Sequence, residues 1–158
     1  GTDGRVYPWG NEYRPDYSNN RAYWEGKNKK LKEQKPSGIW DVLLGIIGKN
    51  RKPEAARWGW LPVGSFEKDV SPYGVYDMAG NVLEWTSSLY RPYHGNTLER
   101  DIFKAEVYVI RGGGYNALPY EYGRTTSRHF RQPSDNSSAV AAWHTDMNIG
   151  IRCVKDAE

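Results

Sequence analysis

The sequence predicts a single α+β domain in which irregular loops outweigh helices and strands. Seven Trp, twelve Tyr and three Phe occur among 158 residues, together with 17 Gly and nine Pro. Rigid aromatic rings fill a core where regular elements are scarce, and Gly and Pro are typical of turns. The best strand, VYVIR at residues 107–111, is short and rich in β-branched and aromatic residues. A chain of this length forms one domain with one core.

Composition and charge exclude several classes of function. Charged residues make up 26% of the chain and the mean hydropathy is −0.82, which is typical of a water-soluble domain. No run approaches the roughly 18 apolar residues of a membrane helix, so we expect no direct membrane insertion. The net charge is +3. The basic run at residues 27–32 lacks the aromatic pattern that stacks bases, so we expect a solvated loop there and no nucleic-acid partner.

The individual elements are expected to be short. We expect irregular structure over residues 1–26 and a short strand at 61–66. The apolar stretch 39–48 has the character of a short helix, and it is either local core or a surface for a partner. A weakly alternating segment follows at 124–131, and the chain closes on a strand at 148–154.

The glycine run at 112–114 and the single cysteine each have a structural explanation that involves no ligand. The glycines at 112–114 follow the best strand, but no Lys-Ser/Thr pair comes after them, so a phosphate cradle is not expected. We expect these glycines to permit close backbone packing or a positive φ. The single cysteine, Cys153, lies in the closing strand and excludes a disulfide within these residues. It is expected to be a buried structural thiol.

Four motifs occur in a specific order along nearly the whole chain. They are YPWGN at 7–11, VGSF at 63–66 followed by YGVYDMAGNVLEW at 73–85, IRGGGY at 110–115 and GIRC at 150–153. Together they closely resemble the formylglycine-generating enzyme family, also called sulfatase-modifying factors. The resemblance implies a C-type-lectin-like fold with a small, twisted antiparallel sheet and much ordered loop. It also implies that residues 1–158 form one such domain without its N-terminal part.

The same resemblance implies a calcium site in the Gly-Asn-x-x-Glu-Trp turn. Asn81 would offer its side-chain oxygen, Val82 its carbonyl and Glu84 its carboxylate, which are hard oxygen ligands that suit Ca²⁺. The alternative is that Asn81 and Glu84 satisfy groups of a buried turn without a metal. A second calcium site of the family would begin near Asn20 and Arg21.

Active members of the family oxidise a substrate cysteine with copper, which two cysteines spaced Cys-x4-Cys hold. By position, the resemblance assigns these cysteines to Tyr120 and Thr125. A phenol and a hydroxyl cannot replace two thiolates as soft ligands for Cu(I). We therefore expect no copper and no catalytic residue at these positions, since fold and activity separate routinely.

The favoured hypothesis is a catalytically inactive member of the family, a pseudoenzyme that binds a protein. Its partner would be another protein or the missing N-terminal half of the domain, within a larger bacterial complex outside the cytoplasm, in the periplasm or at the cell surface. The expected binding surface consists of residue types that make adaptable contacts. These residues are Trp40, Tyr120, Arg124, Arg128, His129, Trp143 and His144.

The alternative hypothesis is a metal-dependent oxidoreductase or maturation enzyme of the same family. It would use the same cleft with different ligands. The residues expected to line that cleft are Arg124, Thr125, Arg128 and His129.

Overall fold

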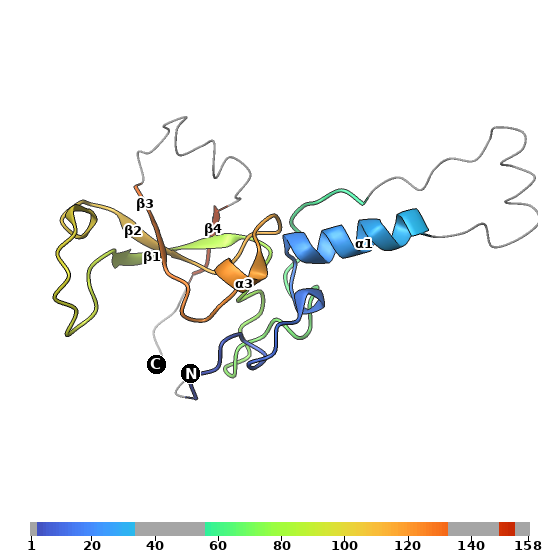
Figure 1. Ribbon diagram of the computed structural model, residues 1–158, viewed down its shortest axis with the longest axis horizontal. Coiled ribbons are helices and arrows are strands. Elements are labelled where there is room, and N and C mark those ends of the chain that lie inside the picture. Colours follow the sequence, from blue (N-terminus) through green and yellow to red (C-terminus); the bar gives the residue numbers. More distant parts are fainter. Residues whose placement is uncertain (1–2, 34–55, 133–148, 154–158) are drawn as a thin grey trace, which may run out of the picture.

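The computed structural model describes residues 3–33, 56–132 and 149–153, and a four-stranded sheet lies at its centre (Figure 1). The strands are β1 (Leu83–Leu89), β2 (Tyr108–Arg111), β3 (His129–Arg131) and β4 (Ile149–Ile151), in the order β3-β2-β1-β4. β2 pairs antiparallel with β1 and β3, whereas β4 pairs parallel with β1. The sheet is therefore mixed, and the prediction of an antiparallel sheet is wrong for β4. Since β4 comes last, long connections separate it from β1, as parallel pairing requires.

Within residues 3–33, 56–132 and 149–153, few helices accompany the sheet, as expected for a loop-rich α+β domain. They are the 3₁₀ helices η1 (Pro15–Tyr17) and η2 (Asp101–Phe103) and the α-helices α1 (Arg21–Glu33) and α3 (Pro119–Tyr122). The helix α1 lies to one side of the sheet and points away from it (Figure 1). No helix within the described ranges combines the length and apolar character needed to cross a lipid bilayer.

The helix α1 contradicts two predictions. The irregular structure expected over residues 1–26 is wrong for residues 21–26, and the solvated loop expected at 27–32 is helical instead. Asn20 caps its N-terminus, because its Oδ1 accepts a hydrogen bond from the backbone N–H of Tyr23 at 3.0 Å. Arg21 and Glu25 form an ion pair one turn apart at 2.7 Å. Trp24 is the helix's one buried residue. A helix with so little apolar surface has no hydrophobic period for a sequence pattern to reveal.

The expected strand at 61–66 is a turn instead. Gly64 has a φ of 77°, and the backbone N–H of Ser65 donates to the carbonyl of Pro62 at 3.2 Å. A positive φ is incompatible with an extended strand, and Pro62 has no N–H for a ladder. The strands expected at 107–111 and 148–154 are confirmed as the shorter β2 and β4. The weakly alternating segment 124–131 contains β3 at its end. The predicted helix at 39–48 lies outside the described residues.

The interior combines a small apolar core with buried polar side chains. The buried apolar residues are Tyr7, Trp24, Ala79, Leu83, Val107, Val109, Ile110 and Ala117. The buried polar residues are Ser18, Asn19, Asn20, Asp69, Asp77 and Asn81. Buried polar groups must be hydrogen-bonded to be tolerated. Much of the interior of this domain is therefore a network of directed bonds between loops.

Two glycines allow backbone segments to approach one another closely. A Cβ on Gly80 would lie 2.6 Å from the carbonyl oxygen of Asn19, and one on Gly113 would lie 2.5 Å from that of Ala79. Both distances are far below a normal contact, so only glycine fits. The turn at 78–81 is thus held between the N-terminal segment and the segment after β2. This confirms the expected close backbone packing of the glycine run.

Cys153 is exposed, so the prediction of a buried thiol is wrong. β4 ends at Ile151 and lies at an edge of the sheet. An edge strand is covered on one side only, and Ile151 itself is 78% exposed.

Candidate functional site

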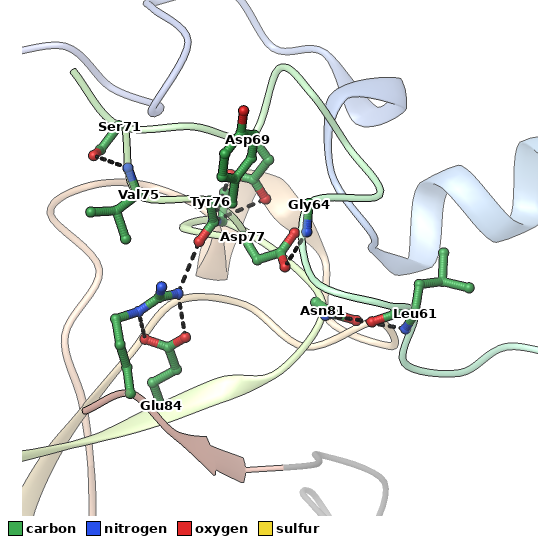
Figure 2. A network of polar contacts seen from close by, with 11 residues as sticks. Leu61, Gly64, Asp69, Ser71, Val75, Tyr76, Asp77, Asn81 and Glu84 are labelled. Carbon is green, nitrogen blue, oxygen red and sulfur yellow. Dashed lines mark hydrogen bonds and ion pairs between the residues drawn. The ribbon is translucent and has the colours of Figure 1, made fainter. Parts of the chain in front are cut away.

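Asn81 ties two distant loops together. Its backbone has a φ of 74°, which asparagine tolerates better than most residues. Its Oδ1 accepts the backbone N–H of Leu61 at 2.9 Å and its Nδ2 donates to the Leu61 carbonyl at 3.0 Å (Figure 2). The same Oδ1 also accepts a hydrogen bond from Asn19 Nδ2 at 2.9 Å. The side chain therefore satisfies the backbone of residue 61 on both sides, as the metal-free interpretation of the turn expects.

Glu84, at the start of β1, forms a two-pronged ion pair with Arg152. Arg152 Nε donates to Oε2 at 2.8 Å and Nη2 donates to Oε1 at 2.5 Å, and Nη2 also donates to the Tyr76 carbonyl at 2.9 Å (Figure 2). The parallel pairing of Glu84 with Gly150 brings these side chains together. The carboxylate raises the pKa of the Arg152 guanidinium. Such a fork is a strong, directional contact.

In this arrangement two of the three predicted calcium ligands, Asn81 and Glu84, already have hydrogen-bonding partners on their side-chain oxygens. Asn81 Oδ1 already accepts two hydrogen bonds, and both carboxylate oxygens of Glu84 contact Arg152. A calcium ion at Glu84 would have to displace the guanidinium of Arg152. In the described part of the chain, no group of three His, Cys, Asp or Glu side chains is placed to hold a metal. Calcium binding through Asn81, Val82 and Glu84 stays a prediction.

Asp69 is a buried carboxyl group beside the same turn. Its side chain is 1% exposed, and its two oxygens accept the backbone N–H of Ala79 at 2.9 and 3.2 Å. Burial raises its pKa to about 7, and the neighbouring charge of Asp77 acts in the same direction, although backbone N–H groups oppose the rise. Desolvation therefore outweighs hydrogen bonding at this group.

We expect Asp69 to make the stability of the domain depend on pH. Because its pKa is about 7 in the folded state against 3.8 ordinarily, the folded protein holds an extra proton between these values. Stability from this group is full below pH 3.8 and is lost as the pH rises through 7. Between pH 5 and 7 the loss amounts to roughly 2–3 kcal/mol.

Urea unfolding of wild type and Asp69→Asn at pH 5, 6, 7 and 8 measures this dependence. The variant is expected to lose the decline that the wild type shows. Asp101→Asn, at an exposed position, is the control and is expected to retain it. Equal slopes in wild type and Asp69→Asn would contradict the assignment.

A pocket of about 520 Å³ opens beside this turn. Its walls come from residues 4–8, 71–78 and 124–127 and from the adjoining ends of β1 and β2. The ends of β1 and β2 lie side by side in this wall because Glu84 of β1 pairs with Arg111 of β2. We call this hollow the Thr125 pocket. Its volume lies within the range of small-molecule and peptide sites.

Thr125, which the resemblance assigns to the position of the second family cysteine, lies in the wall of this pocket. Its Oγ1 donates to the Arg5 carbonyl at 2.6 Å, and its backbone N–H donates to the Val6 carbonyl at 2.8 Å. Arg111 Nη1 donates to the carbonyls of Thr125 and Ser127 at 3.3 and 2.5 Å. The hydroxyl of Thr125 thus fastens the N-terminal segment to the loop at 124–127.

Among the described residues, three arginines line the Thr125 pocket: Arg5, Arg111 and Arg124. Arg5 forms an ion pair with the exposed carboxylate of Asp3, whose pKa it lowers. Arg124 is exposed, and although its carbonyl accepts the backbone N–H of Ser127 at 3.0 Å, its guanidinium makes no hydrogen bond or ion pair with the described part of the chain. Glu84 also lines the pocket, but Arg152 already compensates its charge.

Other residues of the predicted binding surface lie apart from the pocket. The guanidinium of Arg128 lies 4.4 Å from the ring centre of Tyr90 and 4.5 Å from that of Tyr93, and Nη1 donates to the Arg91 carbonyl at 2.7 Å. His129 stacks on Tyr122 at 4.4 Å. Neither Arg128 nor His129 lines the pocket. Tyr120 belongs to α3. Trp40, Trp143 and His144 lie outside the described residues.

Arg5 and Arg111 line the pocket without having been predicted to do so. The motif at 110–115 draws attention to its glycines, whereas the pairing of β2 with β1 is what places Arg111 beside Glu84. Arg5 is 120 positions from its partner Thr125, and no local pattern indicates that contact.

Comparisons with known proteins complete the description. Residues 1–157 match the family described as the sulfatase-modifying factor enzyme 1-like domain. The chain is 29% identical over 161 residues to the inactive C-alpha-formylglycine-generating enzyme 2 of Mus musculus, covering 99% of this chain and 39% of that protein. It is 26% identical over 168 residues to the formylglycine-generating enzyme of Mus musculus, covering 99% and 35%.

A third similarity is partial. The chain is 33% identical over 88 residues to the hercynine oxygenase of Mycolicibacterium smegmatis, covering 49% of this chain and 19% of that protein. Taken together, the chain spans less than half the length of each of these relatives.

Proposed function

Because the chain belongs to the sulfatase-modifying factor family, we propose that it is a non-catalytic member that binds a peptide segment of a protein partner in the Thr125 pocket. The observation that carries this proposal is the state of residue 125. A threonine stands where the resemblance places a copper-binding cysteine, and its hydroxyl donates to the Arg5 carbonyl at 2.6 Å. A hydroxyl that makes this hydrogen bond stabilises the wall of the pocket and is not a metal ligand.

The cysteine content of the chain supports the proposal. Cys153 is the single cysteine, it is exposed, and it does not line the Thr125 pocket. These residues therefore cannot supply the pair of thiolates that Cu(I) prefers. Because the chain is similar both to an inactive formylglycine-generating enzyme and to a formylglycine-generating enzyme, the similarity does not distinguish an inactive from an active member. The residues of the pocket have to do so.

The pocket walls also support a peptide ligand. Tyr73 is 78% exposed and Met78 is 39% exposed, and both line the pocket. Exposed aromatic and methionine side chains are common in surfaces that contact proteins. The partner is another protein or the N-terminal half of the same domain, and the place of action is a bacterial complex outside the cytoplasm.

A metal-dependent oxidoreductase remains the second candidate, since half the chain is similar to an oxygenase. Of the residues expected to serve it, Arg124 and Thr125 line the pocket. Arg128 and His129 are held elsewhere, by Tyr90 and Tyr93 and by Tyr122 respectively. This separation makes the binding function the better supported of the two.

Filling the pocket tests the proposal. Thr126 lines the pocket and is exposed, so Thr126→Trp is expected to occupy it without disturbing the fold. The probe is a mixed library of fluorescein-labelled hexapeptides, with binding followed by fluorescence anisotropy. We expect wild type to bind and Thr126→Trp to bind at least about tenfold more weakly.

Two controls sharpen this experiment. Thr97→Trp introduces the same side chain at an exposed position outside the pocket, and it is expected to bind as wild type does. Wild type is also incubated with Cu(I) and a cysteinyl peptide, and the aldehyde product is sought by mass spectrometry. Sustained aldehyde formation would contradict the proposal, as would equal peptide binding by Thr126→Trp and wild type.

A further inference from the structure

We infer that the Thr125 pocket selects an acidic peptide, in which an Asp or Glu side chain lies next to an apolar side chain. This inference rests on the proposed function and names the chemistry of its ligand.

The walls of the pocket carry an excess of positive charge. In the described part of the chain, Arg5, Arg111 and Arg124 line the pocket and Glu84 supplies the one carboxylate there. Arg152 contacts both oxygens of Glu84, so that carboxylate cannot compensate the arginines.

The three arginines differ in whether a neighbouring carboxylate compensates their positive charge. Asp3 partly compensates Arg5. Arg111 donates to the carbonyls of Thr125 and Ser127 and to the hydroxyl of Tyr93, with distances of 3.3, 2.5 and 3.3 Å. These acceptors are neutral, so they orient Arg111 and leave its positive charge in place.

Arg124 is the guanidinium available to a ligand. Its side chain is exposed at the pocket wall, and the guanidinium has no hydrogen bond or ion pair among the described residues. A guanidinium pairs with a carboxylate through two parallel N–H···O bonds. The unsatisfied fork of Arg124 and the fixed charge of Arg111 therefore form a receptor for one acidic side chain.

Two hydroxyl groups add to this receptor. Ser71 Oγ accepts the backbone N–H groups of Tyr73 and Val75 at 3.2 Å each, which leaves its own proton to donate. Thr126 also lines the pocket. Hydroxyl donors beside guanidinium groups complete the coordination of an anion.

The remaining wall is apolar and fits a neighbouring side chain of the ligand. Pro72, Tyr73, Val75 and Met78 lie together along residues 71–78 of the pocket. A basic ligand side chain would be repelled by the arginines, and a neutral ligand would desolvate Arg124 without giving it a partner. Charge complementarity thus favours an acidic residue beside an apolar one.

The test compares three matched hexapeptide libraries. Each has one fixed position, occupied by Asp/Glu, by Asn/Gln or by Lys/Arg, and apolar residues on both sides. We expect wild type to bind the acidic library about tenfold more tightly than the neutral one. The difference is expected to shrink as NaCl rises from 50 to 500 mM, because salt screens partly exposed charges.

Charge reversal assigns the preference to Arg124. Arg124→Glu is expected to weaken binding of the acidic library about tenfold and to improve binding of the basic one. Arg100→Glu, the same change at an exposed arginine outside the pocket, is expected to leave the order unchanged. A shift of preference in Arg124→Glu alone supports the inference.

The outcomes separate this inference from the proposed function. Peptide binding that Thr126→Trp abolishes, but that shows no preference for acidic residues, overturns the inference and leaves the proposed function standing. Equal effects of Arg124→Glu and Arg100→Glu also overturn it. Absence of binding by every library overturns both.

Discussion

Replacing Asn81 with alanine is expected to lower the free energy of unfolding by about 3–5 kcal/mol. The side chain is 7% exposed and makes three hydrogen bonds, two with the backbone of Leu61 and one with Asn19. The substitution removes all three bonds and takes the Asn81 partner from the part-buried N–H and carbonyl of Leu61, whereas Asn19 Nδ2 keeps its bond to the Gly59 carbonyl at 2.9 Å. Alanine also tolerates the φ of 74° poorly.

Chemical denaturation of wild type, Asn81→Ala and Asn81→Gly measures these contributions. Asn81→Gly relieves the backbone strain but lacks the hydrogen bonds, so it is expected to lie between the other two. The control is Asn96→Ala, because Asn96 is exposed and caps only the local N–H of Leu98. A loss of under 1 kcal/mol in Asn81→Ala would show that the Asn81 network contributes little to stability.

The second large effect is expected at Glu84, where alanine should lower the free energy of unfolding by about 2–4 kcal/mol. The carboxylate is 20% exposed and its partner Arg152 is 31% exposed. Removing Glu84 leaves a partly buried guanidinium with only the Tyr76 carbonyl as acceptor. The pair also holds β4 to β1, so its loss is expected to loosen the sheet edge.

A double-mutant cycle with Glu84→Gln and Arg152→Gln isolates the pair, and Glu99→Ala, at an exposed position, is the control. Additive losses in the cycle would contradict the coupling of Glu84 with Arg152. The calcium prediction has its own signature in the same experiment. If calcium binds at this turn, the melting temperature of wild type rises with calcium and falls with a chelator, while Glu84→Ala responds to neither.

Most of the elements that the sequence predicted correctly depend on residues that are neighbours in the chain. The strand at 107–111, the turn at 78–81 and the closing strand depend on neighbours in the chain, so their patterns are local. The helix α1 was missed because Asn20 and the pair of Arg21 and Glu25 support it with little apolar surface. Cys153 was misplaced because a strand pattern does not reveal which strand lies at an edge of the sheet.

The sequence alone determined the family, through four motifs in order, and the absence of a thiol pair, because a chain with one cysteine cannot hold two. Only the tertiary structure decided which side chains meet. Arg152 reaches Glu84 across 68 positions and Thr125 reaches Arg5 across 120. The physical reason is that such contacts depend on how strands pair and loops close, so that no stretch of sequence contains both partners.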